Sequence, residues 1–324
     1  MSAGPTATEA VMHAPAAPRA AAADQRLGVI YGVAAFGSWG LFPIYFKAIE
    51  HVPALEIVAH RIIWSAVFLL VVLAVRHKWA VFVTALCSWR TLGTLAATAC
   101  LIAGNWLTFI WAVAHDQLLQ VSLGYFINPL LNVLLGFAFL GERLRRWQTV
   151  SVALAVTGVA YLTISAGTLP GVALVLAGTF GFYGLLRKTA KADALVGLTV
   201  ETVLLAPLSL VFLVFIMSRG QAAFLSGSTS TDVLLALAGV VTAVPLALFA
   251  AAARRLRYTT IGFIHYMAPT GQFLLAVFAY HEPFTAAHVV TFIFIWAGVA
   301  IYTIEAALTA RAAPRPAPTA VLPE

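Results

Sequence analysis

Ten long apolar runs, separated by short polar stretches, occupy the chain from residue 28 to residue 307. Each run has about 20 residues, which is the length that a helix needs to cross the hydrocarbon core of a bilayer. Backbone amides cannot remain unpaired in lipid, so we expect every run to form an α-helix. The predicted spans are residues 28–48, 56–75, 91–113, 118–140, 147–165, 169–187, 196–217, 232–253, 258–280 and 284–307.

The composition supports this pattern, because hydrophobic residues make up 62% of the chain and charged residues only 10%. A soluble protein could not bury so much apolar surface, so the bilayer must act as its solvent. Residues 1–26 and 308–324 are rich in alanine and proline, and we expect them to be disordered cytoplasmic tails. The first tail has no basic stretch before a short apolar core, so no secretory signal is expected.

Lysine and arginine lie almost entirely at one end of the predicted spans. With both termini in the cytoplasm, sixteen of these residues fall in the tails and inner loops, and only Arg219 falls in an outer loop. Cytoplasmic loops of membrane proteins carry an excess of Lys and Arg, so the asymmetry places both termini in the cytoplasm. The formal charge of +7 is therefore explained by topology and indicates no nucleic-acid partner.

Residues 121–161 and 261–301 share a pattern when they are aligned without gaps at an offset of 140 positions. The alignment places Pro129 on Pro269, Glu142 on Glu282, and Gly158 on Gly298. Arginines follow only Glu142, so the two copies are expected to cross the membrane in opposite directions. We therefore predict an all-α integral membrane fold with ten transmembrane helices, arranged as two inverted five-helix repeats at residues 27–166 and 167–307.

Nine motifs spread along the ten spans carry a family resemblance. The first half contains SWGLFPIYFK (38–47), EIVAHRIIWS (56–65), GNWLTFIWAV (104–113), SLGYFINPLLNV (122–133) and LGERLRR (140–146). The second half contains YGLLRK (183–188), ETVLLAP (201–207), AARRLRYTTIGF (252–263) and FIFIWAGVAI (292–301). This set resembles the RarD-type permeases, in the EamA branch of the drug/metabolite transporter superfamily. The resemblance implies a ten-span permease of a bacterial-type plasma membrane with an internal inverted repeat, but it implies no particular solute.

Polar side chains within the spans are the candidates for a solute cavity, because polar groups are costly in lipid. Asn128 and Asn132 share one helix face, and the repeat aligns Gln272 with Asn132. Carboxamides suit a polar, uncharged or zwitterionic solute. Hydrogen bonding between helices is the structural alternative. The full set of candidates is Asn105, Trp106, Tyr125, Asn128, Asn132, His265, Tyr266 and Gln272.

Pro129 and Pro269 are candidate hinges, since each proline removes one intrahelical hydrogen bond. The carbonyl groups freed near Tyr125 and His265 are available to a solute, and matched interruptions in two repeats indicate a transport site. A permanent kink without a ligand is the alternative. His265 is also a candidate proton carrier, because imidazole titrates near neutral pH.

Six further residues are candidates for gating or for charge pairs: Glu56, His60, Arg61, Glu142, Glu201 and Glu282. Arg61 lies deep in its span, and we expect it to pair with Glu56 or Glu201. Glu56 begins its span and is expected to be solvated. Glu142 has a basic loop beside it as its expected partner, whereas loop solvation is the alternative for both Glu142 and Glu282.

The chain contains no HExxH, GxSxG or P-loop motif, so we expect no enzyme, no ATP-driven motor, no metal and no cofactor. The predicted function is secondary transport of a small polar or amphipathic metabolite or drug-like solute by alternating access, coupled to protons or to exchange. The expected partners are the lipid bilayer, the solute and protons. The alternatives are an intramembrane enzyme that acts on a lipid-linked substrate through Glu56, His60 and Arg61, and a passive channel or scaffold.

Overall fold

The computed structural model describes residues 18–190, 192–256 and 258–312, and every regular element within these ranges is a helix. The first half contains α2 (Pro18–Lys47), α3 (Ala54–Val75), α4 (Trp79–Cys87), α5 (Trp89–Ala114), α6 (Leu118–Leu140) and α7 (Arg146–Ala166). The second half contains α8 (Gly171–Thr189), α9 (Ala194–Ser218), α10 (Thr229–Ala253), α11 (Tyr258–His265), α12 (Met267–Leu274), the π-helix η1 (Leu275–Ala279) and α13 (Ala286–Ala312).

Nine helical stretches of the described chain are long and apolar enough to cross a membrane. Each coincides with a predicted span, and the remaining predicted span, 169–187, corresponds to α8. This helix has only 19 residues and ends with Arg187 and Lys188, which lower its mean hydropathy. It nevertheless packs along both α5 and α6, in the middle of the bundle.

Two helix boundaries and one additional helix differ from the sequence-based expectation. Helix α2 begins at Pro18, inside the segment 1–26 that was expected to be disordered. Four alanines at residues 20–23 explain the earlier start, because alanine has the highest helix propensity. Helix α13 likewise continues to Ala312, past the expected start of the second tail. The short helix α4 lies in a loop where no element was expected, and residues 1–17 and 313–324 lie outside the described residues.

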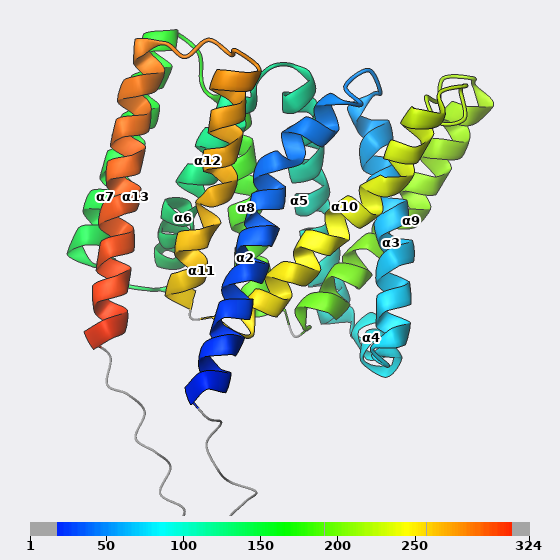
Figure 1. The fold of residues 1–324 in the computed structure, drawn as a ribbon, viewed down its shortest axis with the longest axis horizontal. Helices are drawn as coiled ribbons and strands as arrows, with labels where there is room; N and C mark the ends of the chain where they lie inside the picture. The colour runs from blue at the N-terminus through cyan, green and yellow to red at the C-terminus, as the bar shows by residue number, and fades with distance from the viewer. Residues whose placement is uncertain (1–17, 191, 257, 313–324) are drawn as a thin grey trace, which may run out of the picture.

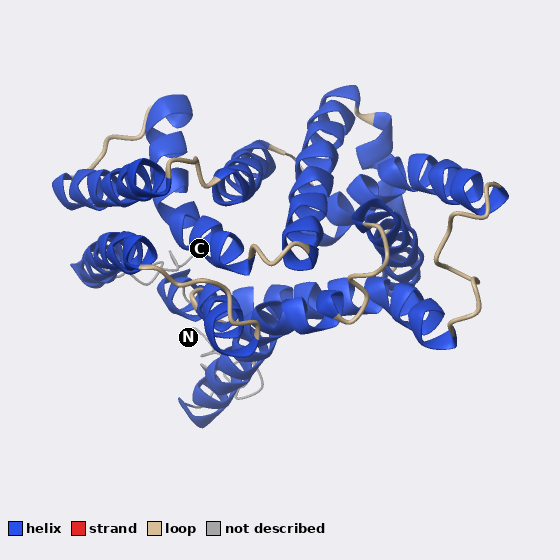
Figure 2. Cartoon of the chain, turned by 90° about the horizontal axis from the view of Figure 1, so that it is seen from above, coloured by secondary structure: helices blue, strands red, loops and turns tan. Residues whose placement is uncertain are grey.

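The helices form a single bundle in which the described ends of the chain lie at the same end (Figure 1). Helices α7 and α13 pair at one edge, whereas α3 and α9 lie at the other, and α10 crosses the bundle obliquely. Seen from above, the described chain consists of helices joined by loops, and many of the helices are tilted from the line of view (Figure 2). Many of the exposed side chains are large and apolar, as expected of a surface that faces lipid.

Corresponding helices of the two halves have corresponding packing partners. Helix α2, the first of its half, packs against α10 and α12, which are the third and fourth spans of the second half. Helix α8, the first of the second half, packs against α5 and α6, which are the third and fourth spans of the first half. The first helix of each half therefore packs against the corresponding two helices of the other half.

The contact between α7 and α13 is reciprocal at the level of single residues. A Cβ atom added at Gly158 would lie 3.1 Å from the backbone oxygen of Thr291. One added at Gly298 would lie 2.8 Å from the backbone oxygen of Ser151. Gly158 and Gly298 are 140 positions apart, and so are Ser151 and Thr291. The later residue of each helix meets the earlier residue of the other, so the two helices pack antiparallel.

Candidate functional site

Asn105 joins three helices near the centre of the bundle. Its side chain is buried, and its Nδ2 donates to the backbone oxygen of Leu176 at 3.1 Å and to Oγ1 of Thr179 at 3.0 Å, both on α8. The hydroxyl group of Tyr125 on α6 donates to Oδ1 of Asn105 at 3.2 Å. Both donors of this carboxamide are therefore engaged, and the structure gives it the interhelical role that was the alternative to a cavity wall.

Asn128 and Asn132 form a pair on one face of α6, as the sequence predicted. Asn132 Nδ2 donates to Asn128 Oδ1 at 3.1 Å. The buried Nδ2 of Asn128 has no hydrogen-bond partner among the described residues. Asn132 also lines a cavity of about 200 Å³, together with Glu142, Arg143 and Tyr302. Asn132 therefore lies at an open pocket at one end of α6, and its neighbour Asn128 carries an unused donor inside the bundle.

Gln272 occupies the matching position on α12. Its Nε2 donates to the backbone oxygen of Trp39 on α2 at 3.2 Å, and its buried Oε1 is without a partner in the described part of the chain. Gln272 therefore offers an unused acceptor, and Asn128 an unused donor. Buried polar atoms are normally paired, so each is available to a ligand or to water.

The two prolines have different effects on their helices. Pro129 lies within α6, which continues from Leu118 to Leu140 without a break. Pro269 lies just after the interruption at Tyr266 that separates α11 from α12, and its carbonyl oxygen accepts from Ser122 Oγ at 2.9 Å. Only Pro269 therefore lies beside a break between helices, because one missing hydrogen bond can bend a helix without ending it.

His265 and Tyr266 flank this interruption, and both pack against aromatic rings. The ring of His265 lies edge-on to Phe36 at 5.2 Å between centroids. The ring of Tyr266 stacks on Phe126 at 6.2 Å. Both side chains are half-buried, and His265 forms no ion pair with a carboxylate among the described residues. These contacts give the pair a packing role beside the break.

Arg61 does not form the expected charge pair. Its side chain is 5% exposed, and its guanidinium carbon lies 4.1 Å from the ring centre of Trp106. The rings of Phe46 and Phe42 lie at 5.7 Å and 5.9 Å. Within the described ranges Arg61 has no ion pair, and its Nε has no hydrogen-bond partner. Trp106, a predicted cavity residue, therefore serves as a face of an aromatic box around a cation.

Glu56 is fully buried, so the expectation that it is solvated is wrong. Its Oε1 accepts from the backbone N–H of Ala223 at 2.8 Å and of Phe224 at 3.1 Å. His60, one turn further along α3, packs its ring against Phe224 at 4.6 Å. Glu56 and His60 together hold the loop between α9 and α10, which explains why neither approaches Arg61 as a partner.

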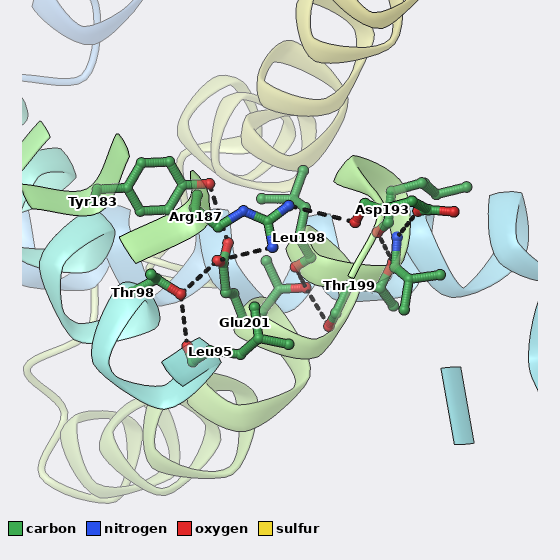
Figure 3. A network of polar contacts seen from close by, with 11 residues as sticks. Leu95, Thr98, Tyr183, Arg187, Asp193, Leu198, Thr199 and Glu201 are labelled. Carbon is green, nitrogen blue, oxygen red and sulfur yellow. Dashed lines mark hydrogen bonds and ion pairs between the residues drawn. The ribbon is translucent and has the colours of Figure 1, made fainter. Parts of the chain in front are cut away.

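Glu201 is the second expected partner of Arg61, and it is also engaged elsewhere (Figure 3). It lies 3.7 Å from Arg187 of α8 and accepts from Thr98 of α5 at 2.7 Å. Tyr183 of α8 donates to its second oxygen at 3.3 Å. The buried carboxylate of Glu201 thus links α5, α8 and α9 and is neutralised by Arg187.

Glu142 and Glu282 have different partners, although they occupy equivalent turns. The N–H of Glu142 donates to Gly136 at 3.2 Å, and that of Glu282 donates to Ala276 at 2.9 Å, again at an offset of 140. The carboxylate of Glu142 is half exposed and binds Lys188 of α8 at 2.8 Å, rather than the adjacent arginines.

Glu282 is buried and caps the beginning of α6. Its two oxygens accept from the backbone N–H groups of Leu118 at 2.5 Å and Leu119 at 2.7 Å. These amides have no partner within the helix and carry partial positive charge. Burial raises the pKa of Glu282, and the two N–H bonds oppose that rise without cancelling it.

Sequence reasoning missed the ion pairs that join distant loops. Lys47, at the end of α2, binds Asp116 between α5 and α6 at 2.7 Å, and it also binds Glu50 at 2.7 Å. Lys78 pairs with Asp193 across the ends of α3 and α9. Asp116 and Asp193 are far from their lysines in the sequence, so the only available signal was a charged residue at the end of an apolar run.

Comparison with known proteins places these features in a family. A model of the EamA-like transporter family matches residues 26–164. The chain is 45% identical to Protein RarD of Escherichia coli (strain K12) over 290 residues, which cover 90% of this chain and 98% of that protein. It is 43% identical to an uncharacterized transporter of Vibrio cholerae over 292 residues, which cover 90% of this chain and 97% of that protein. One solved crystal structure matches with a TM-score of 0.53 and 19% identity, and it covers 86% of this chain and 98% of its own.

Proposed function

The chain belongs to the RarD proteins of the EamA-like transporter family, and from this premise we propose that it is a secondary transporter of a small polar or amphipathic solute that works by alternating access. Family membership makes it a multi-pass membrane transporter and not an enzyme. The proposal concerns what the family does not fix, which is the repeat, the solute and the coupling.

The reciprocal contact between α7 and α13 is the observation that carries the proposal. Gly158 meets Thr291, and Gly298 meets Ser151, with both pairs related by 140 positions. Two equivalent helices that pack antiparallel through equivalent residues are related by a two-fold axis across the bundle. In a membrane this axis lies in the bilayer plane, which is the symmetry of inverted repeats. The repeats are residues 27–166 and 167–307. In this arrangement α8 also crosses the membrane and brings the nine long apolar helices of the described chain to ten spans.

The two ends of the bundle differ in a way that supports an inward-facing arrangement. The cavity at Asn132 opens beside Glu142 and Arg143, at the end that the positive-inside rule assigns to the cytoplasm. At the opposite end, Glu282 holds the start of α6, and Lys47 holds the turn before it through Asp116. Alternating access would require these outer contacts to open while the Lys188–Glu142 contact and its neighbours close the cavity.

The chain encodes no nucleotide-binding motif, so we propose that transport is coupled to protons or to exchange of a second solute. The test is uptake and counterflow in proteoliposomes with an imposed pH gradient, with a panel of neutral, zwitterionic and anionic metabolites. Saturable flux that responds to the gradient or to solute on the other side supports the proposal. Flux that rises linearly with concentration would instead indicate a channel.

Topology is tested separately by labelling single cysteines. Cysteine is placed at Arg143 and at Pro283, in a chain whose Cys87 and Cys100 have been replaced by serine. A membrane-impermeant maleimide should label Arg143→Cys only from the cytoplasmic side and Pro283→Cys only from the outside. Labelling of both positions from one side would contradict the inverted repeat.

A further inference from the structure

Arg61 is a buried cation inside the membrane, and none of the residues that the structure describes forms an ion pair with it. It lies on α3, two turns inside the bundle, and its side chain is almost completely buried. Three aromatic rings from α2 and α5 surround its guanidinium group, which is 4.1 Å from the centre of Trp106. Aromatic faces offset only part of the cost of removing a full charge from water. An isolated charge at this depth marks a functional site by default.

Every carboxylate among the described residues is already in contact with another group. Five bind lysine side chains or cap helix ends at the two surfaces, and the others are held by Arg187, Arg145, Arg255 or backbone amides. The set comprises Asp24, Glu50, Glu56, Asp116, Glu142, Asp193, Glu201, Asp232, Glu282 and Glu305. Glu56 keeps its second oxygen, Oε2, without a partner in the described residues, but it forms no ion pair with Arg61 there; any other carboxylate would have to leave its present partner to neutralise Arg61.

The groups beside Arg61 are neutral, and the hydroxyl protons among them are already engaged, so the guanidinium group itself is the donor available to an anion. Tyr45 of α2 and Tyr125 of α6 lie near enough for their hydroxyl groups to interact electrostatically with the guanidinium group. The hydroxyl of Tyr125 donates to Asn105, and that of Tyr45 donates to Leu234. Trp106 covers a face of the guanidinium plane, but ligands of arginine approach its edge, where the N–H groups point. That edge includes Nε, which has no partner in the described residues.

We propose that the solute of this transporter carries a carboxylate or another oxyanion, and that Arg61 binds this group within its aromatic box. The planar guanidinium group matches two oxyanion oxygens at once, which neither the carboxamides nor the tyrosines of the bundle can do. The remainder of the solute would meet the unused amide groups of Asn128 and Gln272. This inference rests on the proposed function, because it assigns the substrate class of the same central site.

The test compares matched pairs of anionic and neutral probes on the purified full-length protein in detergent. The probes are butyrate against butyramide, succinate against succinamide, and inorganic phosphate, all at constant ionic strength with sodium chloride. Thermal unfolding of the wild-type protein should shift upward with the oxyanions and not with the amides. Arg61→Gln should abolish the shift, whereas Arg219→Gln, which changes an exposed arginine stacked on Phe215, should retain it.

A second measurement does not depend on an Arg61 variant that folds. Trp106 lies against the guanidinium group, so oxyanion binding should change the tryptophan fluorescence of the wild-type protein. Trp106→Phe should lose this change. Equal responses to a carboxylate and its amide, or an unchanged response in Arg61→Gln, would overturn the inference. A response to phosphate alone supports it and narrows the oxyanion to phosphate.

Flux measurements separate this inference from the proposed function. Saturable transport of neutral or cationic solutes, with no oxyanion response in either binding assay, would leave a transporter and overturn the inference. Oxyanion binding that requires Arg61, in a protein that moves none of the panel, would support the inference and contradict secondary transport.

Discussion

The close contact between α7 and α13 makes a sharp prediction for Gly298→Ala. The added methyl carbon would lie 2.8 Å from the backbone oxygen of Ser151, and Leu130 and Leu154 leave it no other space. A backbone oxygen cannot move aside as a flexible side chain can, so the helices must separate. Overpacking of this kind costs about 1–3 kcal/mol. Alanine returns about 1 kcal/mol through its higher helix propensity.

The net expectation for Gly298→Ala is a loss of up to about 2 kcal/mol. Two other glycines provide matched controls. Gly158→Ala meets its neighbours at 3.1 Å, where a small shift suffices, so we expect little net change. Gly178→Ala, in α8, meets nothing within 4 Å and should be stabilising by about 1 kcal/mol.

The assay is thermal unfolding of the three variants and the wild-type protein in the same detergent, at roughly 2–4 °C per kcal/mol for a chain of this size. The expected order of unfolding temperatures places Gly178→Ala highest, then Gly158→Ala, and Gly298→Ala lowest. If Gly298→Ala unfolds at the temperature of Gly178→Ala, the two helices are not in backbone contact, and the symmetry drawn from that contact fails with it.

The remaining predictions concern ion pairs, pH and flux. Glu282→Ala should lower the free energy of unfolding by about 1–3 kcal/mol, because it leaves the first amides of α6 unpaired. Glu282→Gln should lower this free energy less, and thermal unfolding distinguishes the two variants. Because the pKa of Glu282 is raised on folding, protonation of Glu282 stabilises the folded protein. This contribution to the free energy of unfolding is complete below the ordinary pKa near 4.5, and it declines as pH rises through the folded pKa. A plot of unfolding temperature against pH, compared with that of Glu282→Gln, should show the decline. Burial raises the pKa of Asp193, but its bonds to Lys78 and Val196 outweigh that effect and lower the pKa. Its contribution to stability should persist above pH 3.8 and disappear in stronger acid, and Lys78→Gln should weaken this pH dependence, which the unfolding temperature against pH would show. Asn128→Leu should reduce solute flux in proteoliposomes with normal membrane insertion, and unchanged flux would remove Asn128 from the site.

The helices could be predicted from the sequence because the requirement that an apolar run forms a helix depends only on the run itself. An apolar run of about 20 residues must form a helix in lipid whatever surrounds it. The sequence could not tell which of the two prolines accompanies a break in its helix, since Pro129 presents the same local signal as Pro269 and α6 continues through it. Contacts between helices decide which proline accompanies a break.

The partners of charged residues could not be predicted from the sequence either, because contacts between helices determine them. Arg61 could be identified as a residue that needs compensation, but the rotation of each helix determines what it faces. Glu56 turns to amides 167 residues away, and Glu201 turns to Arg187. The offset of 140 between the halves was the one long-range signal in the chain, and the packing of Gly158 and Gly298 follows it.

The contacts of Glu142 and Glu282 imply that ionic strength would act on the two ends of the bundle unequally. Lys188 and Glu142 are both largely exposed, so dissolved salt screens their attraction strongly. Glu282 is shielded from water and held by backbone amides, and salt affects such a contact much less. Concentrated electrolyte would therefore weaken the contact between Lys188 and Glu142 more than the contact between Glu282 and the start of α6. The two equivalent turns would then differ in their response to the surrounding solution.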